Sequence, residues 1–182
     1  PTERPITADG ISEYVNWRIF SINALSEFLK KSYDYAKEVC PELEGMTAAV
    51  TTQPRQGNDT SGVDDFAYAR DMDILGYTDY QTVFGEGYYR SSFIQDFMES
   101  CAAVCGKHAW LVEYDARTNI SLRKFEAETY MALGSGIKGI LYYQWRGDAP
   151  IGATEEDNAF GIINSDGSET AHFREKKNVI SM

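Results

Sequence analysis

The chain has 182 residues, a formal net charge of −11 and a hydrophobic content of 43%, which fits one domain with a sizeable core over residues 1–182. The negative charge argues against nucleic-acid binding, because phosphate contacts require a cationic face. No run of 18 apolar residues is present and the start, PTERPITADG, is no signal peptide, so we expect no membrane contact and a soluble, cytoplasmic protein.

The first half of the chain predicts a long helix and then a short strand. Apolar residues recur at three- and four-residue steps over residues 11–40, where Asp9-Gly10 can start the helix and Pro41 follows its end. Residues 45–53 have the composition of a short buried strand. A turn-rich loop and a short helix over residues 63–71 are expected next.

Three further strand and helix pairs follow. We expect strands at 73–80, 108–115 and 138–146, with helices at 88–105 and 123–138 between them. Gly106 suits the C-terminal cap of the first of these helices. Residues 160–168 predict an extended piece closed by Asp166-Gly167, and residues 168–181 a last helix.

This order, one helix followed by four β-α units, predicts an α/β fold. Strands that alternate with helices imply a parallel sheet of about four strands with flanking helices and right-handed crossovers. The strands are nearly continuous apolar runs, as expected when both faces of a sheet are covered. Four such units suit either a small open sheet or half of an eight-stranded barrel.

The best candidate for chemistry is Glu113, which follows four apolar residues at the end of the strand 108–115. Active sites of parallel α/β folds lie at the carboxyl ends of the strands, and a carboxyl group at the rim of a core can have a shifted pKa. The alternative is a structural carboxylate that caps the next helix or pairs with Arg117 or Arg146.

Other strand ends carry polar and aromatic groups suited to hydrogen bonding and stacking on a sugar ring. They are Gln144, Trp145 and Arg146 after the last strand, Tyr77, Asp79 and Tyr80 on the strand before Glu113, and Thr51, Thr52 and Gln53 on the first strand. Each signal is weak alone, and Trp145 could equally be a core aromatic. Together the four strand ends favour a binding site.

No metal or organic cofactor is expected. Cys101 and Cys105 stand four residues apart without His or Asp companions at ligand spacing, so we interpret them as buried thiols. His108 and His172 have no nucleophile near them in sequence. The glycine-rich motifs of nucleotide-binding loops and the G-x-S-x-G elbow of hydrolases are absent from the sequence.

Several segments together resemble a known family. WLVEYDA (110–116), AETYMALGSGIKG (127–139) and ILYYQWR (140–146) resemble the C-terminal half of a clan A glycoside hydrolase barrel, and most of all the family 42 β-galactosidases. DILGYTDY (73–80), NWRIF (16–20) and FGIINSDGSETAHF (160–173) are also similar to segments of that family. The resemblance implies the second half of a TIM barrel, covering nearly the whole chain.

The resemblance also implies roles for individual residues. Glu113 would be the nucleophile of a retaining hydrolase and Tyr80 would lie beside the sugar. Glu155 (or Glu156) would bind sugar hydroxyls. The further candidate substrate contacts rest on their positions at strand ends and are Trp145, Arg146, Gln144, Tyr77 and Asp79.

A retaining enzyme needs a second carboxyl group as acid/base, which in this clan is a Glu that follows an Asn at the end of the fourth strand. The sequence contains no Asn-Glu pair. We therefore expect half a barrel that is inactive alone.

Two other classes of function stay open. The same strand ends could bind carbohydrate without cleaving it. Alternatively, an open half-barrel could be an interaction domain that covers its unpaired strand edges by self-association.

Overall fold

The computed structural model describes residues 7–50, 63–80, 88–116, 120–147, 160–171 and 173–181. Within these ranges the chain forms an α/β fold whose elements follow the predicted order. They are α1 (Ala8–Val39), β1 (Ala49–Val50), α3 (Asp65–Asp71), β2 (Ile74–Asp79), α4 (Tyr88–Val104), β3 (His108–Asp115), α5 (Leu122–Gly134), β4 (Gly139–Tyr143) and α7 (Phe173–Ile180).

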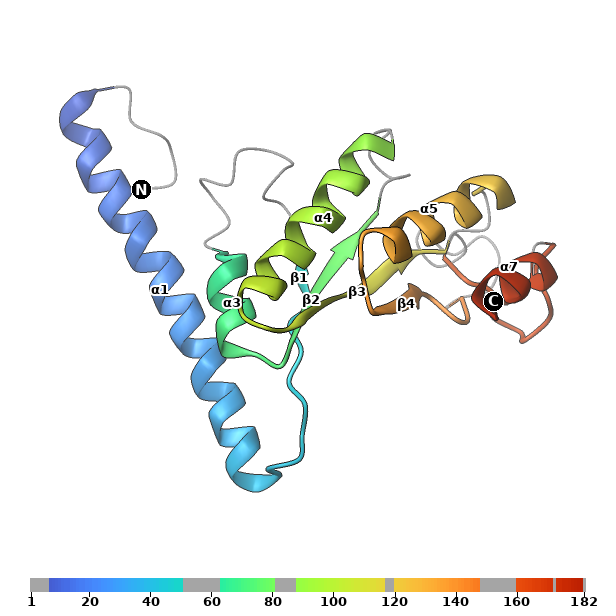
Figure 1. Cartoon of the computed structure of the whole chain (residues 1–182), viewed down its shortest axis with the longest axis horizontal. Helices are drawn as coiled ribbons and strands as arrows, with labels where there is room; N and C mark the ends of the chain where they lie inside the picture. Colours follow the sequence, from blue (N-terminus) through green and yellow to red (C-terminus); the bar gives the residue numbers. More distant parts are fainter. Residues whose placement is uncertain are drawn as a thin grey trace.

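The four strands form one parallel sheet in the order β1-β2-β3-β4. Helices α3, α4 and α5 lie along the sheet, while α1 stands beyond the β1 side and α7 beyond β4 (Figure 1). Because consecutive strands are neighbours and parallel, all four carboxyl ends meet at the same edge. The predicted α/β class with four parallel strands is therefore confirmed.

The main core lies between the sheet and the helices packed on it. Alternate residues of a strand point to the same face, so Leu75 and Tyr77 of β2 join Leu111 of β3 in this core. Helix α4 adds Ile94 and Met98, which stand four residues apart on one face of the helix. All five side chains are fully buried, which fixes the strands that carry the predicted site.

Local caps explain where three helices begin or end. The Asp64 carboxylate accepts hydrogen bonds from the backbone of Phe66 (3.0 Å) and Ala67 (3.2 Å) at the start of α3. Ser121 caps α5 in the same way, at 3.3 Å from the nitrogen of Lys124. Gly106 follows α4 with a φ of +69°, as its predicted capping role requires.

Several bounds differ from the sequence prediction. Helix α1 begins at Ala8 after the N-cap Thr7, so Asp9-Gly10 lies inside the helix instead of starting it. Strand β1 has only two residues, and before it Met46 forms a single bridge to Ile74. Thr51, Thr52 and Gln53 lie outside the described residues.

The end of β4 and the start of the last helix also differ. Strand β4 stops at Tyr143 because the chain then pairs with a later segment. The nitrogen of Gln144 donates to the oxygen of Phe160, and the nitrogen of Ile162 donates to the oxygen of Gln144. The turn closed by Gly167 delays the last helix, so that α7 begins only at Phe173. Within the described ranges, none of the helices is both long and apolar enough to cross a bilayer.

Candidate active site

A β-bulge in β3 sets the position of Glu113. In the register with β2, Leu111 lies opposite Tyr77 and Glu113 lies opposite Thr78, so Val112 is an extra residue without a partner. A bulge bends its strand and re-aims the side chains that follow it. Glu113 is only partly buried, whereas the next residue, Tyr114, lies in the core.

Tyr80 contacts Glu113 directly. It follows β2 at the carboxyl edge of the sheet, and its hydroxyl lies within hydrogen-bonding reach of the Glu113 carboxyl group. Burial raises the pKa of Tyr80 above its usual value, and the charge of Glu113 and a side-chain hydrogen bond to it raise this pKa further. The protonated phenol therefore donates to the carboxylate. The structure thus brings together two predicted site residues from adjacent strands.

Tyr80 is held by two other aromatic rings, and we call Tyr80, Tyr143 and Phe160 the aromatic triad. The ring centroids lie 6.2 Å apart for Tyr80–Tyr143, 5.7 Å for Tyr80–Phe160 and 5.5 Å for Tyr143–Phe160. All three contacts are edge-to-face, the geometry that ring quadrupoles favour. Sequence reasoning missed Tyr143, although it ends β4, and missed Phe160, for which the sequence carries no signal.

Two of the residues predicted after β4, Trp145 and Arg146, are exposed. Trp145 is 60% exposed, and its ring packs edge-on against Phe173 of α7 with centroids 6.1 Å apart. Arg146 is also exposed, and its backbone bridges to Ile163. In the part of the chain that is described, no ion pair joins Arg146 to Glu113. The alternative of Trp145 as a core aromatic is wrong, since its ring is mostly open to solvent.

The other predicted contacts are buried or undescribed. Tyr77 is fully buried in the core cluster, and Asp79 is also buried. Tyr77 is buried because alternate residues of a strand point to the same face, and Tyr77 therefore shares the core-facing side of β2 with Leu75. Tyr77 therefore lies in the core and not on an open surface. Glu155 lies outside the described residues, as do Glu156, Arg117 and His172.

A group of buried charges lies next to the site, and sequence reasoning missed it. Asp115 and Glu128 are each 1% exposed and Lys176 is fully buried. Lys124 lies 3.5 Å from Glu128. Burial raises the pKa of Glu128 to about 7, opposed by Lys124, and burial lowers the pKa of Lys176 to about 8. No sequence signal separates these residues from charges on a solvent-facing helix.

Two cysteines and one histidine that the sequence analysis considered for metal binding or nucleophile chemistry lie in the described part of the chain. Cys101 is buried and Cys105 partly buried, and both are free thiols. His108 lies at the amino end of β3, 3.2 Å from Glu99, and so at the opposite edge of the sheet from Glu113. Within the described ranges, no three His, Cys, Asp or Glu residues are grouped so that they could hold a metal ion.

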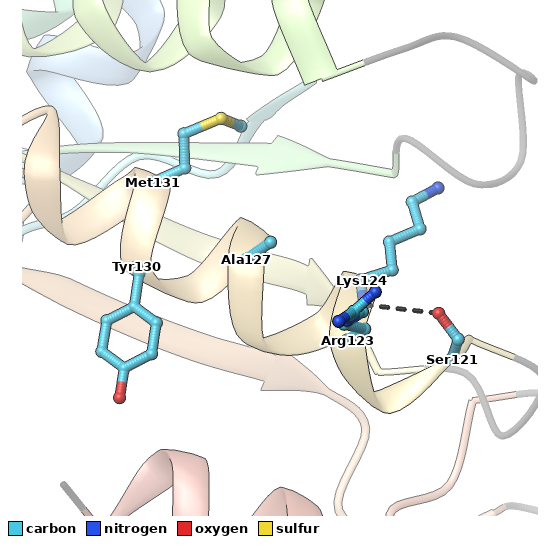
Figure 2. Close-up of a pocket in the computed structure, with 6 residues that line it drawn as sticks. All are labelled: Ser121, Arg123, Lys124, Ala127, Tyr130 and Met131. Atoms are coloured by element: carbon cyan, nitrogen blue, oxygen red, sulfur yellow. Dashed lines mark hydrogen bonds between the residues drawn. The ribbon is translucent and has the colours of Figure 1, made fainter.

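A separate hollow of about 680 Å³ lies along α5. In Figure 2, Tyr130 and Met131 point to opposite sides of the helix, and the hydrogen bond between Ser121 and the Lys124 backbone marks its start. The hollow is lined by Ser121, Arg123, Lys124, Ala127, Tyr130 and Met131. It includes none of the predicted site residues, so it is not the predicted sugar site.

Solved structures of TIM-barrel glycoside hydrolases share this parallel α/β fold. A β-galactosidase from the psychrophilic Marinomonas ef1 matches with a TM-score of 0.67 and 16% identity over 88% of this chain. A GH5_18 protein from Streptomyces cattleya, solved in complex with GlcNAc, matches with a TM-score of 0.69, 11% identity and 88% coverage. The endo-β-1,4-mannanase of Thermotoga petrophila matches with a TM-score of 0.58, 18% identity and 87% coverage.

The family follows from the sequence as a whole. The profile of glycoside hydrolase family 42, described as β-galactosidase, matches residues 1–182, and the chain belongs to this family. The chain spans only 26%, 42% and 40% of the three solved proteins above. A search of curated proteins found no match.

Proposed function

We propose that the chain carries the nucleophile half of a retaining β-galactosidase-like site, with Glu113 as nucleophile. The single observation that carries this proposal is the position of Glu113 after the bulge of β3, partly buried at the carboxyl edge of the parallel sheet and within reach of the hydroxyl of Tyr80. A hydroxyl donor orients a carboxylate, as attack on an anomeric carbon requires. The description of family 42 as β-galactosidase supports a β-galactoside as the substrate class.

The mechanism assigns one step to this chain. A carboxylate oxygen of Glu113 forms a bond to the anomeric carbon as the bond to the leaving oxygen breaks, which gives a covalent glycosyl ester. The leaving oxygen needs a proton, and water must later be activated. The sequence has no Asn-Glu pair to supply the acid/base carboxyl. We propose that the chain alone does not turn over ordinary galactosides.

The test uses a substrate that needs no acid. The substrate is a 2-deoxy-2-fluoro-β-galactoside that carries 2,4-dinitrophenolate as its leaving group. Because this group departs without protonation, the nucleophile can become labelled without an acid. We expect intact-protein mass spectrometry to show one added fluorosugar, and peptide mapping to place it on Glu113. The variant Glu113→Gln should lose the label. The matched variant Glu126→Gln, a partly buried glutamate of α5, should keep it.

The possible outcomes test two statements separately, namely that Glu113 is the nucleophile and that the chain alone does not turn over ordinary galactosides. Label on another residue, or no label at all, would contradict Glu113 as the nucleophile. Hydrolysis of an unactivated galactoside that disappears in Glu113→Gln would show instead that the chain is active by itself.

A second candidate is carbohydrate binding without cleavage, and the exposed Trp145 favours it. Its ring is 60% exposed while Phe173 holds it from the side, which leaves surface open for stacking on a sugar. In calorimetry with galactose, Trp145→Ala should then weaken binding strongly and Glu113→Ala only modestly. Equal losses in the two variants would argue against a binding role centred on Trp145.

A further inference from the structure

A buried lysine of the last helix meets the strand that carries Glu113. Lys176 of α7 is fully buried, and its Nζ donates a 2.7 Å hydrogen bond to the carbonyl oxygen of Ala116, the residue directly after β3. The ammonium also lies 5.5 Å from the ring centroid of Phe125 in α5. A charged side chain is seldom placed in a core unless its donors are used.

Ala116 links this lysine to the aromatic triad. The nitrogen of Ala116 donates a 3.1 Å hydrogen bond to the carbonyl oxygen of Tyr143, so its peptide groups bind α7 on one side and β4 on the other. Tyr143 packs against Tyr80, and Tyr80 donates to Glu113. A continuous chain of contacts therefore runs from the lysine to the proposed nucleophile.

We infer that Lys176 is a positioning residue for Glu113, acting through Ala116, Tyr143 and Tyr80. The role of Glu113 in this inference rests on the proposed function. The plain alternative is that Lys176 only attaches α7 to the body of the domain. Val179 lies on the same helix and packs against the cluster that contains Ala116 and Phe125. Its side chain has no ammonium group that could bind the carbonyl of Ala116. It therefore supplies a matched control for the attachment of α7.

The experiment places 4-fluorophenylalanine at position 160 and follows its fluorine NMR signal. Phe160 touches both Tyr80 and Tyr143, and the label titrates no proton. Lys176→Met keeps the length of the side chain but removes the donor, so we expect it to shift the signal. Val179→Ala should lower the melting temperature and leave the signal in place. Equal shifts in both variants, or none in Lys176→Met, would overturn the inference.

A titration of the unaltered Lys176 gives an independent test should Lys176→Met not fold. The neutral amine is a weaker donor than the ammonium, so the fluorine signal should move with a midpoint near pH 8. The measurement uses the Glu128→Gln background, because the Glu128 carboxyl has its own midpoint near 7. A signal without inflection near pH 8 would overturn the inference. The other charged groups of β3, α5 and α7 are Glu113, Asp115, Arg123, Lys124, Glu126, Arg174, Glu175 and Lys177.

The rate at which Glu113 is labelled by the fluorosugar is a separate measurement from the fluorine NMR signal. If Glu113 is labelled as proposed, Lys176→Met should slow the labelling roughly ten- to a hundredfold, the cost of a small misplacement, while Val179→Ala should not. If the wild-type chain is not labelled at all, the proposed function fails, and the fluorine signal still decides the role of Lys176.

Discussion

Glu128 is a buried carboxyl group whose protonation we expect to affect stability. Its folded pKa of about 7 lies above the usual 4.5, so the folded chain holds a proton that the unfolded chain releases between these values. Stability should therefore fall as pH rises from about 4.5 to about 7. We expect Glu128→Gln, which stays neutral, to be more stable than the wild type at pH 8 by up to about 3 kcal/mol. Urea unfolding from pH 4.5 to 8 measures the difference.

The ion pair with Lys124 supplies the control for this prediction. Lys124 lies 3.5 Å from Glu128 and opposes the effect of burial on its pKa. Lys124→Met should therefore steepen the loss of stability with pH, while the double variant with Glu128→Gln should lack the contribution of Glu128 to this loss. A wild-type protein as stable at pH 8 as at pH 5 would contradict a raised pKa.

Tyr80→Phe isolates the hydroxyl that binds Glu113. The ring would stay in the aromatic triad, but the carboxylate would lose its donor. A hydrogen bond to a charged group contributes about 1.5–3 kcal/mol, so labelling of Glu113 should slow roughly ten- to a hundredfold. Mass spectrometry of the labelled protein over time measures the rate. An unchanged rate would show that the hydroxyl plays no part in holding the nucleophile.

At the scale of elements, short helices depend on their caps. Asp64 accepts hydrogen bonds from two backbone N–H groups of α3, a helix of seven residues. Asp64→Ala should lower the free energy of unfolding by about 1 kcal/mol, whereas Asp64→Asn, which can still cap, should cost little. Urea unfolding of both variants checks this. Equal losses would mean that the charge of Asp64, and not its capping bond, is what matters.

Strand β2 depends on a glycine for a close approach. A Cβ at Gly76 would overlap the carbonyl oxygen of Thr47 and crowd Val112, the extra residue of the bulge before Glu113. The hydroxyl of Thr47 also bonds both the nitrogen and the oxygen of Gly76, each at 2.9 Å. Gly76→Ala should therefore cost about 3 kcal/mol and disturb the site.

Gly134 provides the matched control for Gly76. It ends α5, and an added Cβ there would meet nothing within 4 Å. Gly134→Ala should be neutral or stabilise the chain by up to about 1 kcal/mol, because alanine favours helices. Thermal unfolding compares the two variants. Similar melting temperatures would contradict the close approach at Gly76.

At the scale of the whole molecule, α1 presents an apolar stripe that the described residues leave exposed. The stripe consists of Trp17, Phe20, Phe28, Tyr35 and Val39, which recur at three-, four- and seven- or eight-residue spacings. Exposed apolar surface of this kind marks an interaction face. We expect the isolated chain to self-associate through it. Phe28→Glu should lower the mass found by light scattering, while Tyr89→Glu, outside the stripe, should not.

The sequence by itself determined the order of the elements and the strand that carries Glu113. Strand β3 was placed at 108–115 and found there, because an apolar run between a helix cap and a polar loop is a local signal. Family membership was likewise readable from the segments 110–116 and 127–146. The resemblance implied that Tyr80 would lie beside the sugar, and its position next to Glu113 agrees with the rule that parallel strands end at one edge.

Only the tertiary structure decided which side chains meet. The bulge at Val112, the placing of Tyr77 in the core, and the approach of Phe160 to Tyr80 depend on register and on contacts between distant segments. The burial of Lys176 against Ala116, 60 residues away along the chain, has the same origin. Patterns of three to four residues report local periodicity, whereas burial and hydrogen bonding across the sheet are set by how whole elements pack.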